Sequence, residues 1–282
     1  MILFFRQWQG ELLKLFARRR TFIGFGVFLA LETFILFRLR TGGLKNMING
    51  ALTRQGASLE YYDSALTMAL QVLGISCFLL GGIYITLIAG DIVAKENEDG
   101  HFRLLLVRPI SRLRLLAVKF LTCCCYTLVL VQFMAWSSFL LGLAIKGWGG
   151  GFFALLLVDN VSELHDWNDG LYHYATASLF LAFAMTAISS IAFFLSCFSI
   201  KPAAATIGAL SYALSDLILK QTPYMQDYEH LLLTKHIAAW GQLLLASPDW
   251  AVVARSFTVL VAVNASLFIA GAAVFESRDL KS

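Results

Sequence analysis

Six long apolar runs constrain the fold of this 282-residue chain more than any other feature. An α-helix rises about 1.5 Å per residue, so about 20 apolar residues cross the hydrocarbon core of a bilayer. The runs cover residues 21–37, 66–90, 119–145, 176–200, 203–219 and 251–275. Only 14% of the residues are charged, against about 25% in soluble domains, which excludes a soluble enzyme and a nucleic-acid-binding domain. We therefore predict an all-α membrane protein whose six transmembrane helices form one domain over residues 21–282.

The distribution of Lys and Arg predicts the orientation of the spans. An even number of spans places both termini on the same side of the membrane. If that side is the cytoplasm, the inner segments carry 14 of the 22 cations and the outer segments carry 8, in agreement with the positive-inside rule. The first outer loop carries four of those eight, which weakens the bias. We expect a multi-pass protein with both termini in the cytoplasm.

Residues 1–20 are predicted to form an amphipathic helix at the membrane surface. Phe5, Trp8, Leu12 and Leu15 recur at helical spacing, while basic side chains lie on other faces. Such a helix lies in the interface with its basic face toward anionic lipid. The alternative is that these residues are only a positively charged start of the first span. A signal peptide is disfavoured, because Glu32 interrupts the apolar run and no small-residue cleavage site follows it.

The segment over residues 91–118, between the second and third spans, is the most unusual connection in the chain. An acidic turn ends at Gly100, three leucines follow, and Pro109 ends that piece. Ser111 is placed to cap the helix that leads into the third span. If the segment packed onto the membrane surface, anionic lipid would repel its acidic residues. We interpret it instead as a short projecting helix that offers charged and apolar side chains to a partner.

The order of residues in this segment carries a family resemblance. An acidic turn with Gly precedes an apolar stretch, a Pro-hydrophobic-Ser-Arg stretch and a lysine at the head of the next span. The matching residues are Glu96, Glu98, Gly100, Leu104, Leu105, Leu106, Arg108, Pro109, Ile110, Ser111, Arg112 and Lys119. This pattern resembles the cytoplasmic loop of ABC-2 type ABC transporter permease subunits. The six-span plan, the N-terminal helix with Glu11 and Lys14, and the closing residues 275–280 fit the same family, whereas His101 stands where Thr often follows the Gly.

The resemblance implies a function for the loop over residues 91–118. It implies a permease subunit, with export as the expected direction, powered by a separate ATPase subunit that docks on this loop. The turn is expected to be shaped by Glu96, Glu98 and Gly100. A groove on the ATPase is expected to be filled by Phe102, Leu104, Leu105 and Leu106. Its surface carboxylates are expected to pair with Arg103 and Arg108. The resemblance also implies the bacterial inner membrane, contact with lipid, and a second permease subunit that is either identical or related; no nucleic acid is expected.

The motifs of enzymes are missing from the sequence. There is no Gly-x-x-x-x-Gly-Lys-Ser/Thr loop, no Gly-x-Ser-x-Gly elbow and no His-Glu-x-x-His helix. We therefore expect a transport subunit that is not an enzyme and holds no cofactor, with ATP and Mg²⁺ bound by the partner ATPase. Two other hypotheses stay open. In the first, the chain is a membrane scaffold that recruits a cytoplasmic protein. In the second, it is an intramembrane enzyme.

Polar side chains inside the spans are candidates for a translocation path or for contacts between helices. They are Glu32, Gln71, Gln132, Asp216 and Asn264. Glu32 lies about 17 Å along the first span by helix rise, and carboxylates at such depth commonly face a cavity or a partner. The alternative is that Glu32 reaches toward Arg38 or Arg40. Asp216 has a simple partner in Lys220, four residues on.

The remaining candidates are histidines, cysteines and outer loops. His165, Asp169 and His173 form a polar cluster whose spacing matches no closed metal motif, so a metal site there is only a weak alternative. The cysteines at residues 123–125 point in three directions on a helix and cannot share one metal. The outer connections after residues 38, 146 and 220 are expected to carry short extracytoplasmic helices or re-entrant pieces.

Overall fold

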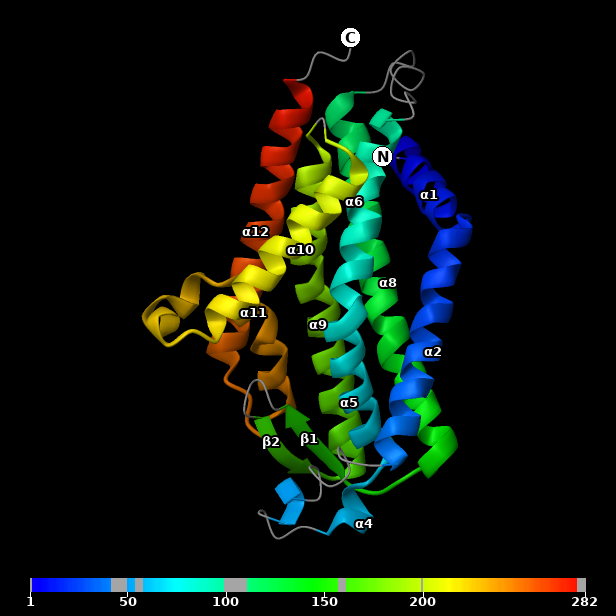
Figure 1. Ribbon diagram of the computed structural model, residues 1–282, viewed down its shortest axis with the longest axis vertical. Coiled ribbons are helices and arrows are strands. Elements are labelled where there is room, and N and C mark those ends of the chain that lie inside the picture. Colours follow the sequence, from blue (N-terminus) through cyan, green and yellow to red (C-terminus); the bar gives the residue numbers. More distant parts are fainter. Residues whose placement is uncertain are drawn as a thin grey trace.

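The computed structural model describes residues 2–41, 50–53, 58–98, 111–156, 161–198 and 200–277. They form an elongated bundle of helices that run side by side along its long axis (Figure 1). The first helix starts and the last helix finishes at the same end of this bundle. Below, this end is called the terminal end, and the other is called the hairpin end.

Five helices among the described residues are long and apolar enough to cross a membrane. They are α2 (Arg19–Thr41), α8 (Arg112–Lys146), α9 (Trp167–Ser196), α10 (Pro202–Lys220) and α12 (Trp250–Glu276). Each coincides with one of the predicted runs, and Pro202 occupies the first turn of α10, where no hydrogen bond is lost. The chain is a helical membrane protein, as the apolar runs predict.

The second apolar run is helical but interrupted. It comprises α5 (Ala65–Ser76), a π-helix η1 (Cys77–Gly81) and α6 (Gly82–Glu98). A π-turn has i→i+5 hydrogen bonds and occurs mostly as a single wide turn inside an α-helix. Neither α5 nor α6 alone reaches the length of a span, although together they extend about 50 Å by helix rise. A count of six spans therefore stays a prediction that depends on this interrupted helix.

Helix α9 lies at the centre of the bundle. It packs against α6, α8, α10 and α12, and 61% of its most apolar window is buried, compared with 17% for α10 and for α12. Small residues such as Ala182 and Ala184 line its contacts and are fully buried, which lets neighbouring helices approach closely. The peripheral helices expose large apolar side chains instead, among them Ile218 on α10 and Ile269 on α12. Such exposure suits contact with lipid.

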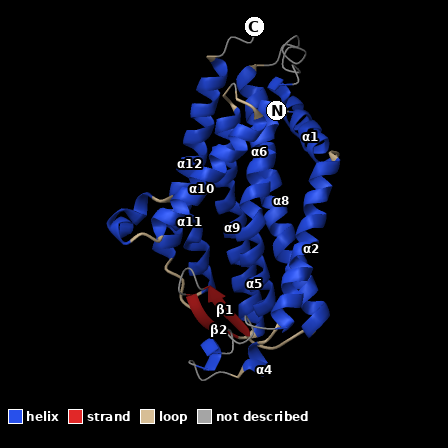
Figure 2. Cartoon of the chain, in the orientation of Figure 1, coloured by secondary structure: helices blue, strands red, loops and turns tan. Residues whose placement is uncertain are grey.

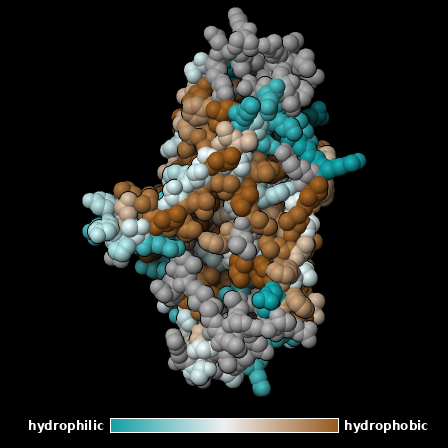
Figure 3. Space-filling view, in the orientation of Figure 1, coloured by the Kyte–Doolittle hydropathy of each residue, from teal (hydrophilic) through white to brown (hydrophobic). Residues whose placement is uncertain are grey.

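Helix α1 (Ile2–Phe16) precedes α2 in the structure, and its place in the membrane interface stays a prediction. It packs against α8 at the terminal end, where Leu15 is buried and the ring of Phe16 contacts that of Tyr126. Leu3 and Leu13 are exposed. Figure 3 shows brown apolar side chains over the middle of the visible face and teal hydrophilic ones gathered near α1. This distribution agrees with a helix at the edge of an apolar band.

A β-hairpin at the hairpin end corrects the expectation of a helical element after α8. Strand β1 (Phe152–Leu156) pairs antiparallel with β2 (Val161–His165), in a register that places Phe152 opposite His165 (Figure 2). Gly147, Gly149 and Gly150 have φ of 78°, 110° and 96°, values that only glycine adopts readily. The chain therefore leaves α8 in a sharp turn, and an apolar run this short is equally suited to a strand.

Polar contacts hold the hairpin against α5. Thr67 Oγ1 accepts a hydrogen bond of 2.9 Å from the backbone N–H of Phe153. Gln71 Nε2 donates one of 2.7 Å to the carbonyl oxygen of Leu155. Because these side chains pair with backbone groups at the edge of β1, the hairpin is fixed to the α5 half of the interrupted helix.

Short helices connect the long ones, and their extracytoplasmic location stays a prediction. One is α4 (Leu59–Tyr62). Three more connect α10 to α12: η2 (Pro223–Leu231), α11 (Leu233–Ala238) and η3 (Ala239–Leu244). Trp240 and Leu244 of η3 are buried against the bundle. The later part of this connection therefore packs on the bundle, whereas η2 is mostly exposed and projects from it (Figure 1).

Candidate functional site

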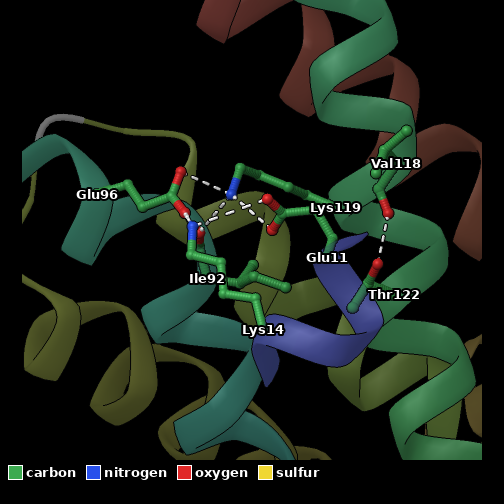
Figure 4. A network of polar contacts seen from close by, with 7 residues as sticks. All are labelled: Glu11, Lys14, Ile92, Glu96, Val118, Lys119 and Thr122. Carbon is green, nitrogen blue, oxygen red and sulfur yellow. Dashed lines mark hydrogen bonds and ion pairs between the residues drawn. The ribbon is translucent and has the colours of Figure 1, made fainter. Parts of the chain in front are cut away.

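Four charged residues from three helices meet at the terminal end of the bundle (Figure 4). Glu11 and Lys14 come from α1, Glu96 from α6 and Lys119 from α8. Lys119 Nζ lies 2.7 Å from Glu96 Oε2 and 3.4 Å from Glu11 Oε2. Lys14 forms ion pairs with Glu96 and, at 3.7 Å, with Glu11. We call these four residues the charged cluster.

The two members of the charged cluster on α6 and α8 are buried, whereas Glu11 and Lys14 of α1 keep part of their surface exposed. Lys119 has no exposed surface and Glu96 is 3% exposed, and Lys119 also contacts the carbonyl oxygen of Ile92 at 3.4 Å. The cluster contains two positive and two negative groups, which is how buried charges are tolerated. Burial would raise the pKa of Glu96, but Lys119 and Lys14 together outweigh that effect and hold this pKa below its ordinary value. Glu96 is therefore ionised at neutral pH.

Local helix geometry brings these side chains together. Glu11 and Lys14 are three residues apart and share one face of α1. Ile92 and Glu96 are one turn apart on α6, so a single ammonium group reaches both. Helix α8 begins after Ser111, whose hydroxyl accepts from the N–H of Arg114 at 3.4 Å; the predicted cap is confirmed. Lys119 follows two turns later, facing α1 and α6.

The expected coupling residues have different positions. Glu96 is buried inside the charged cluster, whereas Glu98 is exposed at the end of α6. The other expected coupling residues lie outside the described residues: Gly100, Phe102, Arg103, Leu104, Leu105, Leu106 and Arg108. The ion pair between Lys14 and Glu96 was not predicted. Lys119 offered an indirect signal, since a lysine at the start of an apolar run needs a buried acidic partner.

The side chain of Glu32 turns into the bundle, toward α8. Its side chain is fully buried, and Ser137 Oγ of α8 donates a hydrogen bond of 2.6 Å to Glu32 Oε2. Arg38 is exposed. The contact therefore joins α2 to α8 within the apolar part of the bundle.

The other polar residues of the spans make contacts of three kinds. Asn264 of α12 accepts from Ser190 and donates to Thr186 at 3.2 Å, which ties α12 to α9. Gln71 holds the β-hairpin, as described above. Gln132 accepts from Trp136 on its own helix at 3.2 Å.

The carboxylate of Asp216 caps the N-terminus of α11. Its carboxylate accepts from the backbone N–H of Leu233 at 3.2 Å, from that of Thr234 at 2.5 Å, and from the Thr234 hydroxyl. It thereby satisfies free N–H groups in the first turn of α11. The sequence suggested Lys220 as the partner of Asp216, because a local i,i+4 pair is visible in the sequence and the folding back of α11 is not.

The histidine cluster is held by backbone groups. The His165 and His173 ring centroids are 4.4 Å apart. His165 Nε2 lies 2.8 Å from the carbonyl oxygen of Leu244, and His173 Nδ1 lies 2.7 Å from that of Leu243. Asp169 is exposed. No group of three His, Cys, Asp or Glu residues that could hold a metal occurs within the described ranges.

These features describe a helical membrane protein with a buried ionic connection at one end. A family model for ABC-2 family transporter proteins matches residues 9–216 and so includes all four residues of the charged cluster. The chain belongs to this family. A stretch of 72 residues is 39% identical to the uncharacterized protein YhcI of Bacillus subtilis (strain 168), covering 26% of this chain. The match spans 23% of the length of that relative.

Proposed function

We propose that this chain is the permease subunit of an ABC-2 type exporter, and that a separate ATPase drives it by docking on the loop over residues 91–118. Family membership supports a transport function. The charged cluster carries the more specific part of the proposal. It ties α6 and α8, the two helices that flank residues 99–110, to each other and to α1.

A displacement of this loop would reach the whole bundle. Because Lys119 and Glu96 are buried and only 2.7 Å apart, the ends of α6 and α8 move together. Both helices pack against α9, so their motion is transmitted to the centre. In this mechanism the ATPase binds ATP and Mg²⁺, and a second permease subunit, identical or related, completes the pathway. Two-fold symmetry is the commonest arrangement of such paired subunits.

Biochemical reconstitution tests the proposal. The tagged full chain is purified from its native membrane, and a co-purifying ATPase with a P-loop is identified by mass spectrometry. Both are then reconstituted in nanodiscs, and ATP hydrolysis is measured. Gly100→Pro and Glu98→Arg are expected to reduce both ATPase binding and stimulated hydrolysis. Glu98 is exposed, so its substitution leaves the folded bundle intact.

Lys146→Met serves as the matched control at the hairpin end. Lys146 is exposed and pairs with Asp63 at 2.6 Å, far along α8 from the loop. This variant should bind and stimulate the ATPase as the natural chain does. The proposal is wrong if no ATPase co-purifies, or if the loop variants stimulate hydrolysis as well as Lys146→Met. A co-purifying protein without ATPase activity would favour the scaffold hypothesis.

A further inference from the structure

The carboxyl group of Glu32 is the most unusual polar group in the bundle outside the charged cluster. It is fully buried on α2, about 17 Å along the span by helix rise. The surrounding core of α2 and α5 is apolar and includes Ile35, Leu36, Met68 and Val72. Within the described part of the chain, its one hydrogen-bond partner is Ser137, and Oε1 is buried without a partner.

The donors around Glu32 are too few for an ionised carboxylate. Two carboxylate oxygens together accept about four hydrogen bonds, and an isolated charge in an apolar interior is very costly. Asp216 provides an internal comparison, because its carboxylate is also buried on a membrane helix. That carboxylate receives three hydrogen bonds from the start of α11. Glu32 receives one, from a neutral hydroxyl.

The geometry of Ser137 fits a protonated partner. Its Oγ lies 2.6 Å from Glu32 Oε2 and 3.3 Å from the carbonyl oxygen of Met134. A serine hydroxyl has a single hydrogen, so it cannot donate to both oxygens at full strength. If Glu32 carries a proton on Oε2, the carboxyl group donates to Ser137, and Ser137 donates to Met134. All three groups then take part in a continuous chain of hydrogen bonds.

We propose that Glu32 is a buried proton-binding site, which holds one proton at neutral pH and donates it in a hydrogen bond to Ser137. Among the described residues, the thiol of Cys77 on η1 and the phenol of Tyr174 on α9 are the titratable groups close enough to interact electrostatically with Glu32. Both are neutral in their ordinary forms at pH 7, so neither supplies a positive charge. The proton is the ligand of this site, and it stays while α2 and α8 remain in contact.

Infrared difference spectroscopy of the full chain in nanodiscs tests this proposal. The spectrum of the natural chain at pH 7 is compared with that of Glu32→Gln, which has nearly the same shape and cannot be ionised. We expect the variant to lose one carbonyl band of a protonated carboxylic acid. Asp216→Asn is the matched control and should leave that band in place. The measurement needs no ATPase, so its result is independent of the proposed function.

Ser137→Ala gives a second readout that keeps the carboxyl group, and it remains informative if Glu32→Gln does not fold. Loss of the hydrogen bond is expected to shift the same carbonyl band. Three results would overturn the proposal. In the first, Glu32→Gln removes carboxylate bands and no acid band. In the second, the Glu32 bands respond to Na⁺ or K⁺, which would identify a metal cation as the ligand. In the third, Ser137→Ala leaves the acid band unchanged.

Discussion

Lys119→Met should destabilise the bundle strongly, because it removes the central cation of the charged cluster. Methionine has a similar length, so the substitution removes charge with little loss of volume. At the 2.7 Å separation of Lys119 and Glu96, Coulomb attraction at an effective dielectric constant of about 20 amounts to roughly 6 kcal/mol. The desolvation of both groups offsets part of this energy. Breaking one partner of a buried pair generally costs about 3–5 kcal/mol.

We expect a value near the lower limit, about 3 kcal/mol, since Lys14 remains beside Glu96 after the substitution. Such a loss changes the equilibrium between folded and unfolded chain roughly 100-fold. The assay is unfolding in mixed micelles with increasing SDS, followed by circular dichroism, which yields the free energy of unfolding. Lys146→Met is again the control, because its exposed pair with Asp63 should contribute about 1 kcal/mol or less.

A double-mutant cycle separates the pair from other effects of the substitution. When Lys119→Met is combined with Glu96→Gln, the buried carboxylate that lost Lys119 is replaced by a neutral amide, so much of the lost stability should return. The coupling energy between two such sites in contact is generally about 0.5–3 kcal/mol. A stabilising role of the Lys119–Glu96 pair is refuted if Lys119→Met costs no more than Lys146→Met, or if the double variant is as unstable as the sum of the single variants.

Three further predictions concern other contacts. Because the pKa of Glu96 is lowered, the ionised Glu96 should stabilise the fold fully at any pH above an ordinary carboxyl pKa. This stabilisation should be lost as the pH falls through the lowered pKa. The free energy of unfolding of Glu96→Gln, measured against pH, should lack this acid-sensitive part. Asn264→Leu should cost about 0.6–1.7 kcal/mol by SDS unfolding; a larger loss would contradict the structure, because Ser190 and Thr186 keep hydrogen bonds within α9. Asp216→Ala should release the start of α11, costing about 0.5–2 kcal/mol, and hydrogen exchange in residues 223–238 should increase; unchanged exchange would contradict the capping contact.

The helical spans were predictable, because apolar length and helix rise are properties of the sequence itself. The positions of the ends were less predictable: α9 begins at Trp167, whereas its apolar run begins at residue 176. Polar residues such as Asn168 and Asp169 delay the apolar run, although the helix has already begun. The β-hairpin could not be predicted, because a five-residue apolar stretch fits a strand or a helix equally well, and its contacts to Thr67 and Gln71 are made across a large sequence separation.

The charged cluster was only partly predictable. Glu11, Lys14, Glu96 and Lys119 each stand out as charged residues close to apolar segments, and the loop containing Glu96 resembled a known family. Their pairing, however, joins positions 82 and 108 residues apart, and no local spacing encodes such a contact. Glu32 illustrates the same limit. Local spacing suggested the arginines at the end of α2, whereas the rotation of α2 against α8 selects Ser137.

The wide turn at Cys77–Gly81 divides the helix that carries Glu96 into two mechanically different halves. The half nearer the β-hairpin is anchored through Thr67 and Gln71, and the other half carries the charged cluster. Each α-helical residue advances the chain by about 100°. If the wide turn tightened into ordinary α-helix, its one extra residue would shift along the helix. Glu96 would then rotate by about 100° relative to the anchored half. A change of pitch at the wide turn would therefore turn the half that carries Glu96 relative to the half that holds the β-hairpin.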